Sequence, residues 1–534
     1  MILTKSKKLN DGRYILYPAK YDEKFRDLAR RYPGLIWDKK LKGWIGYSDS
    51  IYLLIQKLEE EKVSKVIGEL PSTTPSDPLS FIEYGVPLRN YQKATVDFLY
   101  NKSSEGALLA DETGLGKTKP TLYVMRELGM PWVVVCPAVV KRVWMREAEK
   151  IGLSVTILSG VKPPENIKLK KEDGIVIINY DIVYAWLDVL KGAVGTVFDE
   201  GHALTNATSR RSKVCRELSH SSKHRIVITA SPMTNRTKNL WNIIETISPG
   251  RFGSFFSFAL RYTNALKETI NVKGEEKEIW NFDGASNLEE LNARLKHLML
   301  RRTKAEAALE LPPKIRQIVE IDVPLNKISR EWNLDDTSAV RLALNISAKA
   351  KMTQAVELAI NHMDEGNNVI IFAHQRSVVA ELKDLFKEKG HFIYTATGEN
   401  SAEKRDDTIQ EAAQSPIPCV LAVTTHSMGA GIDLTFANIG IVIELDYVPA
   451  RIIQMEGRQD RPGQTKNTLL QYLIGIGTID ELIRDAVLNK LEVIEQVIGP
   501  TGNNLKKDLS GGKNENDALN ELRAALLEMG KEYE

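Results

Sequence analysis

A glycine-rich loop between a short apolar run and a helix places the tightest limit on the fold of this chain. The apolar run Ala107–Ala110 continues directly into Asp111-Glu-Thr-Gly-Leu-Gly-Lys-Thr118. The two glycines let the backbone N–H groups point at phosphate oxygens, and the following helix adds the positive end of its dipole. Lys117 can neutralise phosphate charge, and the Thr118 hydroxyl can hold Mg²⁺. The strict pattern has glycine at position 111, so a simple glycine-rich turn is the alternative interpretation.

An acidic motif further along the chain favours the phosphate-binding interpretation. The apolar run Val194–Phe198 ends in Asp199-Glu-Gly-His202. A carboxylate at the end of a strand in the same sheet can reach Mg²⁺, and Glu200 can polarise an attacking water. A lone Asp-Glu pair is often only a solvated turn, but its position after the phosphate loop supports a catalytic role. The two motifs predict an ATP hydrolysis site with ATP and Mg²⁺ as cofactors and with Thr118 and Asp199 as metal ligands.

Strand-like and helical segments alternate over most of the chain, which predicts α/β domains with parallel sheets. We expect domains at residues 85–311, including a mostly helical region at about 239–311, and at 312–499. Residues 1–70 predict a small α+β domain followed by a linker at 71–84, and residues 500–534 a polar linker and a terminal amphipathic helix. Short buried strands are expected at residues 107–110, 132–136, 175–178, 194–198, 225–229, 368–373, 392–395, 419–424 and 439–444.

Composition excludes several classes of protein. Three well-separated cysteines provide no paired metal spacing and favour a reducing compartment. The longest apolar run, around Trp132–Val140, is too short to cross a membrane, and no secretory signal is visible. Lys and Arg (72) nearly balance Asp and Glu (70), but residues 1–65 carry 15 basic and nine acidic side chains. We therefore expect a cytoplasmic monomer, associated with a nucleoid or acting in a virus-infected host cell, with a basic N-terminal domain.

The segments Asp111–Thr118 and Asp199–His202 together resemble those of Swi/Snf-type superfamily 2 helicase-like ATPases. Thr113 stands where this family usually has methionine, Ala230 where glycine is common, and Gly201 makes an unusual acidic motif. Other segments resemble the family's motifs in the same order, between about residues 85 and 495: Pro87–Gln92, Val135–Pro137 with Trp144 and Glu147, Thr229–Asn235, Leu298–Lys304 with Leu311–Lys314, Ile370–Phe372, Gly429–Asp433, and Gln454–Arg461 with Gly463 and Gln464.

This resemblance implies two tandem RecA-like domains with ATP between them, and it implies roles for individual residues. Arg458 and Arg461, three residues apart, are expected on one helix face directed at the γ-phosphate. The implied catalytic residues are Lys117, Asp199, Glu200, Arg458 and Arg461. The implied ATP-binding residues are Arg89, Gln92, Thr113, Gly114, Gly116, Lys117, Thr118, Gly431, Asp433 and Gln454. Coupling is implied for His202, Thr229 and Ser231, and DNA contact for Ser231, Thr424 and Thr425.

The N-terminal domain has a weaker resemblance of its own. The run Pro33-Gly34…Trp37-Asp38…Lys42-Gly-Trp44 is similar to the HepA-related (HARP) domain, which accompanies annealing helicases that remodel replication forks. The resemblance implies that Lys39, Lys42 and Trp44 contact DNA. The alternative is a small α+β domain with two core tryptophans and solvated lysines.

Together the resemblances imply an ATP-dependent DNA translocase that remodels branched DNA by reannealing or branch migration. Its partners would be duplex and branched DNA, possibly also single strands. Thr113 leaves a strand-separating helicase as the alternative, and an RNA-directed or polymerase-recycling motor is a further one. A DNA-binding scaffold without ATPase activity is disfavoured by the presence of the residues that hydrolysis requires.

Overall fold

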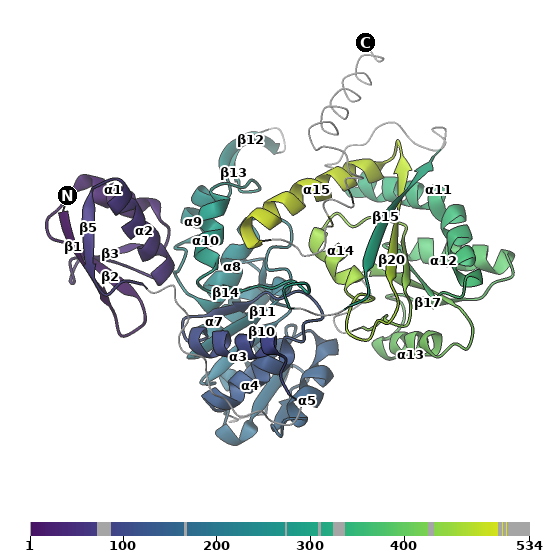
Figure 1. Cartoon of the computed structure of the whole chain (residues 1–534), viewed down its shortest axis with the longest axis horizontal. Helices are drawn as coiled ribbons and strands as arrows, with labels where there is room; N and C mark the ends of the chain where they lie inside the picture. Colours follow the sequence, from purple (N-terminus) through teal and green to yellow (C-terminus); the bar gives the residue numbers. More distant parts are fainter. Residues whose placement is uncertain are drawn as a thin grey trace, which may run out of the picture. The chain divides into compact units, whose positions relative to one another are not determined.

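The computed structural model describes residues 2–71, 87–164, 168–272, 275–307, 311–323, 337–425 and 432–499, together with residues 505 and 509. The chain divides into two compact units (Figure 1). Met1–Ala307 and Val493–Pro500 form the first, and Ala308–Glu492 and Thr501–Glu534 form the second. The N-terminal domain therefore belongs to the same unit as the first α/β domain. Most of the expected linker at 71–84 and the expected terminal helix lie outside the described residues.

The N-terminal module, residues 2–71, is a mixed sheet covered by two helices. The five strands lie in the order β3-β4-β2-β1-β5, in which only β1 and β5 pair in parallel. Phe25, Leu28, Leu54 and Leu58 pack from the helices into the core. The elements are β1 (Ile2–Lys8), β2 (Tyr14–Pro18), α1 (Glu23–Arg31), β3 (Ile36–Asp38), β4 (Gly43–Gly46), α2 (Ser48–Glu60) and β5 (Ser64–Gly68).

The first α/β domain is built on a seven-stranded parallel sheet in the order β14-β6-β11-β10-β7-β9-β8 (Figure 1). The five strands expected here are confirmed to within one residue at each end. The sheet strands are β6 (Ala107–Leu109), β7 (Trp132–Cys136), β8 (Val155–Ile157), β9 (Ile175–Asn179), β10 (Gly195–Asp199), β11 (His224–Ile228) and β14 (Met299–Leu300). The helices are α3 (Asn90–Lys102), α4 (Thr118–Leu128), α5 (Lys141–Glu149), α6 (Val183–Leu190), α7 (Arg210–His220), α8 (Lys238–Ile247), α9 (Phe255–Tyr262) and α10 (Leu288–Leu295).

The prediction that residues 239–311 are mostly helical is only partly correct. Between α9 and α10 the chain forms an antiparallel hairpin of β12 (Leu266–Val272) and β13 (Glu275–Asn281). Its lysines and glutamates suggested an exposed helix. Residues such as Thr269 and Trp280, however, belong to the β-branched and aromatic types that favour strands.

The second unit contains a six-stranded sheet in the order β15-β20-β19-β16-β18-β17, again entirely parallel. The expected fold of two parallel-sheet α/β domains with a small N-terminal α+β domain is therefore confirmed. The strands are β15 (Lys314–Asp322), β16 (Val369–Ala373), β17 (Ile393–Ala396), β18 (Val420–Thr424), β19 (Ile439–Val442) and β20 (Thr468–Ile476). The helices are α11 (Thr337–Asp364), α12 (Arg376–Glu388), α13 (Ala402–Ala413), α14 (Pro449–Glu456) and α15 (Ile479–Ile498).

Within the described residues, every helix is too short or too polar to cross a membrane.

Candidate ATP-binding site

The glycine-rich loop connects β6 to α4, as the sequence predicts. Gly114 and Gly116 have φ angles of 88° and 66°, in the left-handed region that favours glycine. Thr118 is the first residue of α4, and no side chain caps the amino end of this helix. Because the first N–H groups of a helix have no partner within it, this end can donate hydrogen bonds to an anion.

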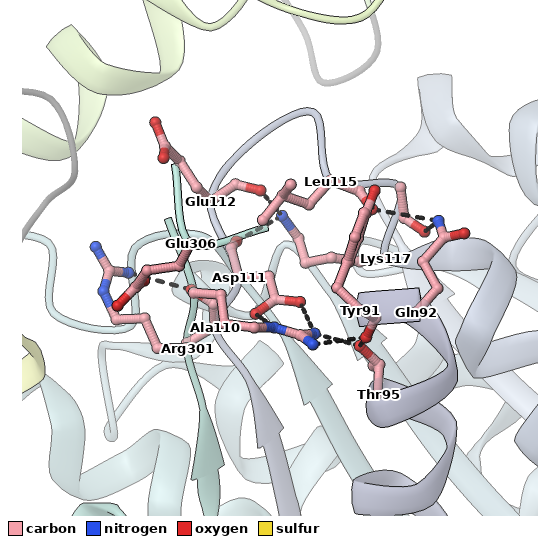
Figure 2. Close-up of polar contacts among 12 residues, drawn as sticks. Tyr91, Gln92, Thr95, Ala110, Asp111, Glu112, Leu115, Lys117, Arg301 and Glu306 are labelled. Carbon is pink, nitrogen blue, oxygen red and sulfur yellow. Dashed lines mark hydrogen bonds and ion pairs between the residues drawn. The ribbon is translucent and has the colours of Figure 1, made fainter. Parts of the chain in front are cut away.

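Lys117 reaches back across the loop (Figure 2). Its Nζ donates to the backbone oxygens of Asp111 at 2.8 Å and Glu112 at 3.1 Å. Burial lowers the pKa of Lys117, and the nearby carboxylates of Glu200, Asp111 and Asp199 oppose that shift. The structure thus brings Lys117 together with both acidic residues predicted to be catalytic.

Asp199 lies at the carboxyl end of β10 and is held on both carboxylate oxygens. Trp144 Nε1 donates to Oδ2 at 2.7 Å, and the backbone N–H of Glu200 donates to Oδ1 at 2.9 Å. Tyr180 donates its hydroxyl to the backbone oxygen of Asp199 at 2.8 Å. Burial and the charge of Glu200 raise the pKa of Asp199 to about 6, although Trp144 and Lys117 favour its ionised form. A bound cation would lower this pKa, so the carboxylate suits a metal ligand.

The residues after Asp199 have an unusual backbone. Glu200 has φ 52° and ψ 50°, a conformation that is uncommon for residues other than glycine. Its carboxylate Oε2 lies 3.3 Å from His202 Nδ1. At the end of β11, beside β10, the backbone N–H of Ser231 donates to the Thr229 hydroxyl at 3.2 Å. These contacts bring the candidate coupling residues to the same sheet edge as Asp199, and their coupling role stays a prediction.

Residues of α3 support the loop from the other side (Figure 2). Gln92 Nε2 donates to the backbone oxygens of Leu115 and Gly116, each at 3.4 Å, and Tyr91 donates its hydroxyl to Leu115 O at 3.0 Å. The backbone N–H of Arg89 donates to Gln92 Oε1 at 3.1 Å. Gln92 therefore lies at the loop with Arg89 beside it, and the binding of ATP by these two residues stays a prediction.

Asp111, which occupies the position of the missing glycine, is an anchoring residue. Its side chain is 2% exposed and forms a two-point ion pair with Arg302, at 2.6 and 3.2 Å. Arg302 also donates to the backbone oxygen of Tyr91 at 2.6 Å and contacts the Thr95 hydroxyl. Because Arg302 follows β14, which pairs with β6, the loop is tied to the end of the first domain.

Two neighbours of Arg302 strengthen this attachment. Arg301 Nη1 donates to the backbone oxygens of Ala110 and Ala230, each at 3.1 Å. The backbone N–H of Lys304 donates to Glu112 Oε2 at 2.8 Å. The segment Leu298–Lys304, identified in the sequence only as a family motif, therefore anchors the amino end of the phosphate loop.

Several of the predicted ATP-site residues lie in the second unit. Helix α14 ends at Glu456, so the prediction that Arg458 and Arg461 share a helix face is wrong. The helix stops at Gly457, and both arginines lie in the turn that follows; Arg461 Nε donates to Gly457 O at 2.9 Å. Burial lowers the pKa of Arg461, while the carboxylate of Asp433 favours its charged form.

Four further predicted residues belong to the same unit. Gln454 lies in α14 and is half-buried, whereas Gly431 lies outside the described residues. Thr424, the last residue of β18, is buried, and the Thr425 hydroxyl lies 2.7 Å from His374 Nδ1. Contact of these threonines with DNA stays a prediction.

The predicted DNA-binding residues of the N-terminal module differ in exposure. Lys39 and Lys42 are exposed in the turn between β3 and β4. Trp44, in contrast, is only 7% exposed and packs in the module core, and its contact with DNA stays a prediction. Trp37 lies edge-on to Trp44 with ring centroids 5.6 Å apart and is 41% exposed. Trp37 is therefore the ring available to a ligand.

The donors of this site fit a nucleotide polyphosphate. The loop combines two left-handed glycines, an uncapped helix start and a lysine, and Asp199 with Thr118 provides oxygen ligands of the kind that Mg²⁺ prefers. Parallel sheets that carry a phosphate loop and an acidic strand end define the class of helicase-like nucleotide-binding domains.

Comparison with known families agrees with that class. Residues 91–372 match the SNF2-related domain, and residues 350–463 match the helicase conserved C-terminal domain. The chain therefore belongs to the SNF2-related family.

Two of the curated relatives of this chain come from animals. The chain is 26% identical to the DNA annealing helicase and endonuclease ZRANB3 of Mus musculus over 470 residues, which cover 82% of the chain and 42% of that protein. It is 28% identical to the SWI/SNF-related matrix-associated actin-dependent regulator of chromatin subfamily A-like protein 1 homolog of Caenorhabditis elegans, covering 88% of the chain and 72% of the relative. The chain thus spans less than half the length of the mouse protein.

A solved structure of the Sulfolobus solfataricus SWI2/SNF2 ATPase core in complex with dsDNA is 25% identical. It covers 81% of this chain and 97% of its own, with a TM-score of 0.40.

Proposed function

We propose that this protein is an ATP-dependent DNA translocase that remodels branched DNA by reannealing strands or by branch migration. The observation that carries the proposal is the convergence of Lys117, Asp199 and Glu200 at one edge of a parallel sheet in a chain of the SNF2-related family. The ZRANB3 relatives are named DNA annealing helicases, which supports the choice of substrate.

In this proposal each catalytic residue has a separate task. Lys117 binds the terminal phosphates, and Thr118 with Asp199 would hold Mg²⁺, which supplies neutralising charge when bound. Glu200 orients the attacking water. Trp144 positions Asp199 by binding its Oδ2 atom.

Arg458 and Arg461 complete the site by offering positive charge to the transition state. Such a contribution is worth about 10³-fold or more in rate. Because both arginines belong to the second α/β domain, hydrolysis in this proposal requires residues of both domains, which would allow ATP turnover to be coupled to movement.

DNA would be held mainly through its phosphates. We assign these contacts to Ser231, Thr424 and Thr425 in the α/β domains and to Lys39 and Lys42 in the N-terminal module. Such contacts do not depend on base sequence and weaken with salt. Action as a monomer in the cytoplasm is part of the same proposal.

The test is the ATP hydrolysis rate in the presence of single-stranded DNA, duplex, fork, four-way junction or RNA, with Glu200→Gln as the blank. We expect strong stimulation by duplex and branched DNA. Stimulation by single strands alone would instead support a strand-separating helicase, and stimulation by RNA alone would support an RNA-directed motor. Absence of stimulation by every nucleic acid would refute the translocase.

The Lys117→Ala variant separates catalysis from binding. ATP turnover should disappear because the phosphate charge is no longer neutralised, whereas DNA binding, measured without nucleotide, should be largely retained. Unchanged turnover in a folded Lys117→Ala protein would contradict the assignment.

A further inference from the structure

A groove of about 880 Å³ lies within the first unit, where the N-terminal module meets the first α/β domain. One side is formed by α2 and by Lys8 and Tyr14 of the module, and the other by α3 and the end of α10. Its volume falls within the range of about 300–1,000 Å³ that is usual for ligand-binding clefts. None of the residues assigned to ATP hydrolysis lines this groove.

The two walls are joined by a buried ionic cluster, which we call the Asp49 triad: Asp49, Arg251 and Arg294. Asp49 Oδ1 lies 2.9 Å from Arg251 Nε, and Asp49 Oδ2 lies 2.7 Å from Arg294 Nε. All three side chains are 0% exposed. Arg294 also donates to the Ser50 hydroxyl at 2.7 Å. The groove is therefore preformed, and a ligand would not have to order its walls.

The charge around the groove favours an anion. Asp49 and Arg294 of the triad both line the groove, and their opposite charges offset each other. Lys8, Lys102 and Lys296 line the groove from three separate segments. Asp97 and Glu105 also line it and offset part of this charge. A net positive potential remains, and low-dielectric walls concentrate such a potential.

Aromatic side chains line the groove beside the lysines. Tyr52 on α2 and His297 after α10 contact each other at the groove, with ring centroids 6.2 Å apart and ring planes tilted by 51°, and Phe98 on α3 lines the same space. All three rings are partly exposed. Sequence-independent sites for single-stranded nucleic acid combine two features: aromatic rings stack on the bases, and lysines contact the phosphates.

We propose that this groove is a second nucleic-acid site, which binds a short single-stranded segment with bases against Tyr52, Phe98 or His297 and phosphates at Lys102 and Lys296. The role of this site rests on the proposed function, since a remodelled junction supplies a single-stranded arm. The binding itself can be measured without ATP or a motor, so the two proposals can fail separately.

The first experiment measures binding of a fluorescent oligodeoxythymidylate of about 10 nucleotides to the full chain over a range of salt concentrations. The variant is Lys102→Gln with Lys296→Gln. Each lost phosphate contact lowers the salt slope by about 0.7, which is about fivefold in affinity at 0.1 M salt. We therefore expect a slope reduced by about 1.4 and affinity reduced by about 20-fold.

Lys213→Gln with Lys223→Gln is the matched control, because both lysines are exposed in the same unit and line no part of the groove. This pair should retain the affinity and the slope of the unmodified chain. Equal effects of the two variant pairs would overturn the proposal, as would no effect of either.

A second measurement does not depend on substitution. An oligonucleotide carrying 5-iododeoxyuridine is crosslinked to the unmodified chain by light, and the adduct is located by mass spectrometry. An adduct at Tyr52, Phe98 or His297 is expected, and adducts found only elsewhere would refute the site. Failure of duplex DNA to stimulate ATP hydrolysis by the same preparation would count against the translocase and not against the groove.

Discussion

Asp49→Ala should release the N-terminal module from the first α/β domain. The substitution leaves Arg251 and Arg294 buried without their shared carboxylate. Removing one partner of a fully buried ion pair typically costs about 3–5 kcal/mol, because the other charge stays desolvated. A loss of about 4 kcal/mol corresponds to about a 10³-fold lower equilibrium constant for docking of the module.

The assay uses a protease site placed within residues 72–86. After cleavage of the folded protein, the N-terminal fragment should co-elute with the rest of the chain in gel filtration. The same fragment should separate when Asp49 is replaced by Ala. Asp27→Ala is the control, because Asp27 is exposed and its ion pair with Arg26 lies in solvent, where such pairs contribute little to stability. The reasoning is refuted if the Asp49→Ala fragment stays bound, or if the unmodified fragment separates.

The same ion pairs give docking a definite pH dependence. Arg251 and Arg294 lower the pKa of Asp49 below its ordinary value, although burial acts in the opposite direction. Because the pKa of Asp49 is lowered in the docked state, its charge stabilises docking at pH values above the ordinary aspartate pKa of 3.8. This stabilisation of docking is lost as the pH falls below 3.8. The cleaved fragment should therefore still co-elute with the rest of the chain at pH 5.

Three other perturbations test the site and the module. Trp144→Phe removes the hydrogen bond that favours the charged form of Asp199, so the pKa of Asp199 should rise above about 6. The acidic limb of the pH profile of kcat/KM for MgATP should then move to higher pH. An unmoved limb would contradict the role of Trp144. Arg302→Ala leaves Asp111 buried and unpaired. The free energy of unfolding of the first domain, measured in urea, should fall by about 3–5 kcal/mol. Adding Asp111→Asn should restore part of this stability. Trp37→Ala should leave the melting midpoint unchanged, since the ring is 41% exposed. It should weaken binding of fork DNA, measured by fluorescence anisotropy. A lowered melting midpoint would show that the ring is structural.

The sequence predicts the central strands well because they are continuous apolar runs. β7 is Trp-Val-Val-Val-Cys and is buried at every position, as a parallel strand between helical layers requires. β15 gives no such signal, since Lys314 and Arg316 interrupt its apolar residues. Both cations instead pair with buried Glu456 of α14, whose pKa they lower to about 2, and Lys314 also pairs with Asp460 at 2.9 Å. Only the folded structure brings that carboxylate to the strand.

The candidate site shows the same limit. Lys117 and Asp199 could be predicted because each stands at a fixed offset from a strand end. The contact of Trp144 with Asp199 spans 55 positions, and that of Arg302 with Asp111 spans 191. No local spacing encodes such pairs. The burial of Trp44 could not be predicted for a related reason, because alternation in a short strand does not reveal which face the rest of the sheet covers.

The attachment of the phosphate loop to Arg302 affects how the protein is made. A ribosome completes the loop about 190 residues before it adds Arg302, so the nascent chain carries Asp111 without its counter-charge for most of the synthesis of the first domain. Strand β14 supplies that partner only when it joins the edge of the sheet beside β6. The loop therefore reaches its final form only after the last strand of its domain has been translated, and a prematurely terminated chain that ends before Met299 has the glycine-rich motif without its anchor.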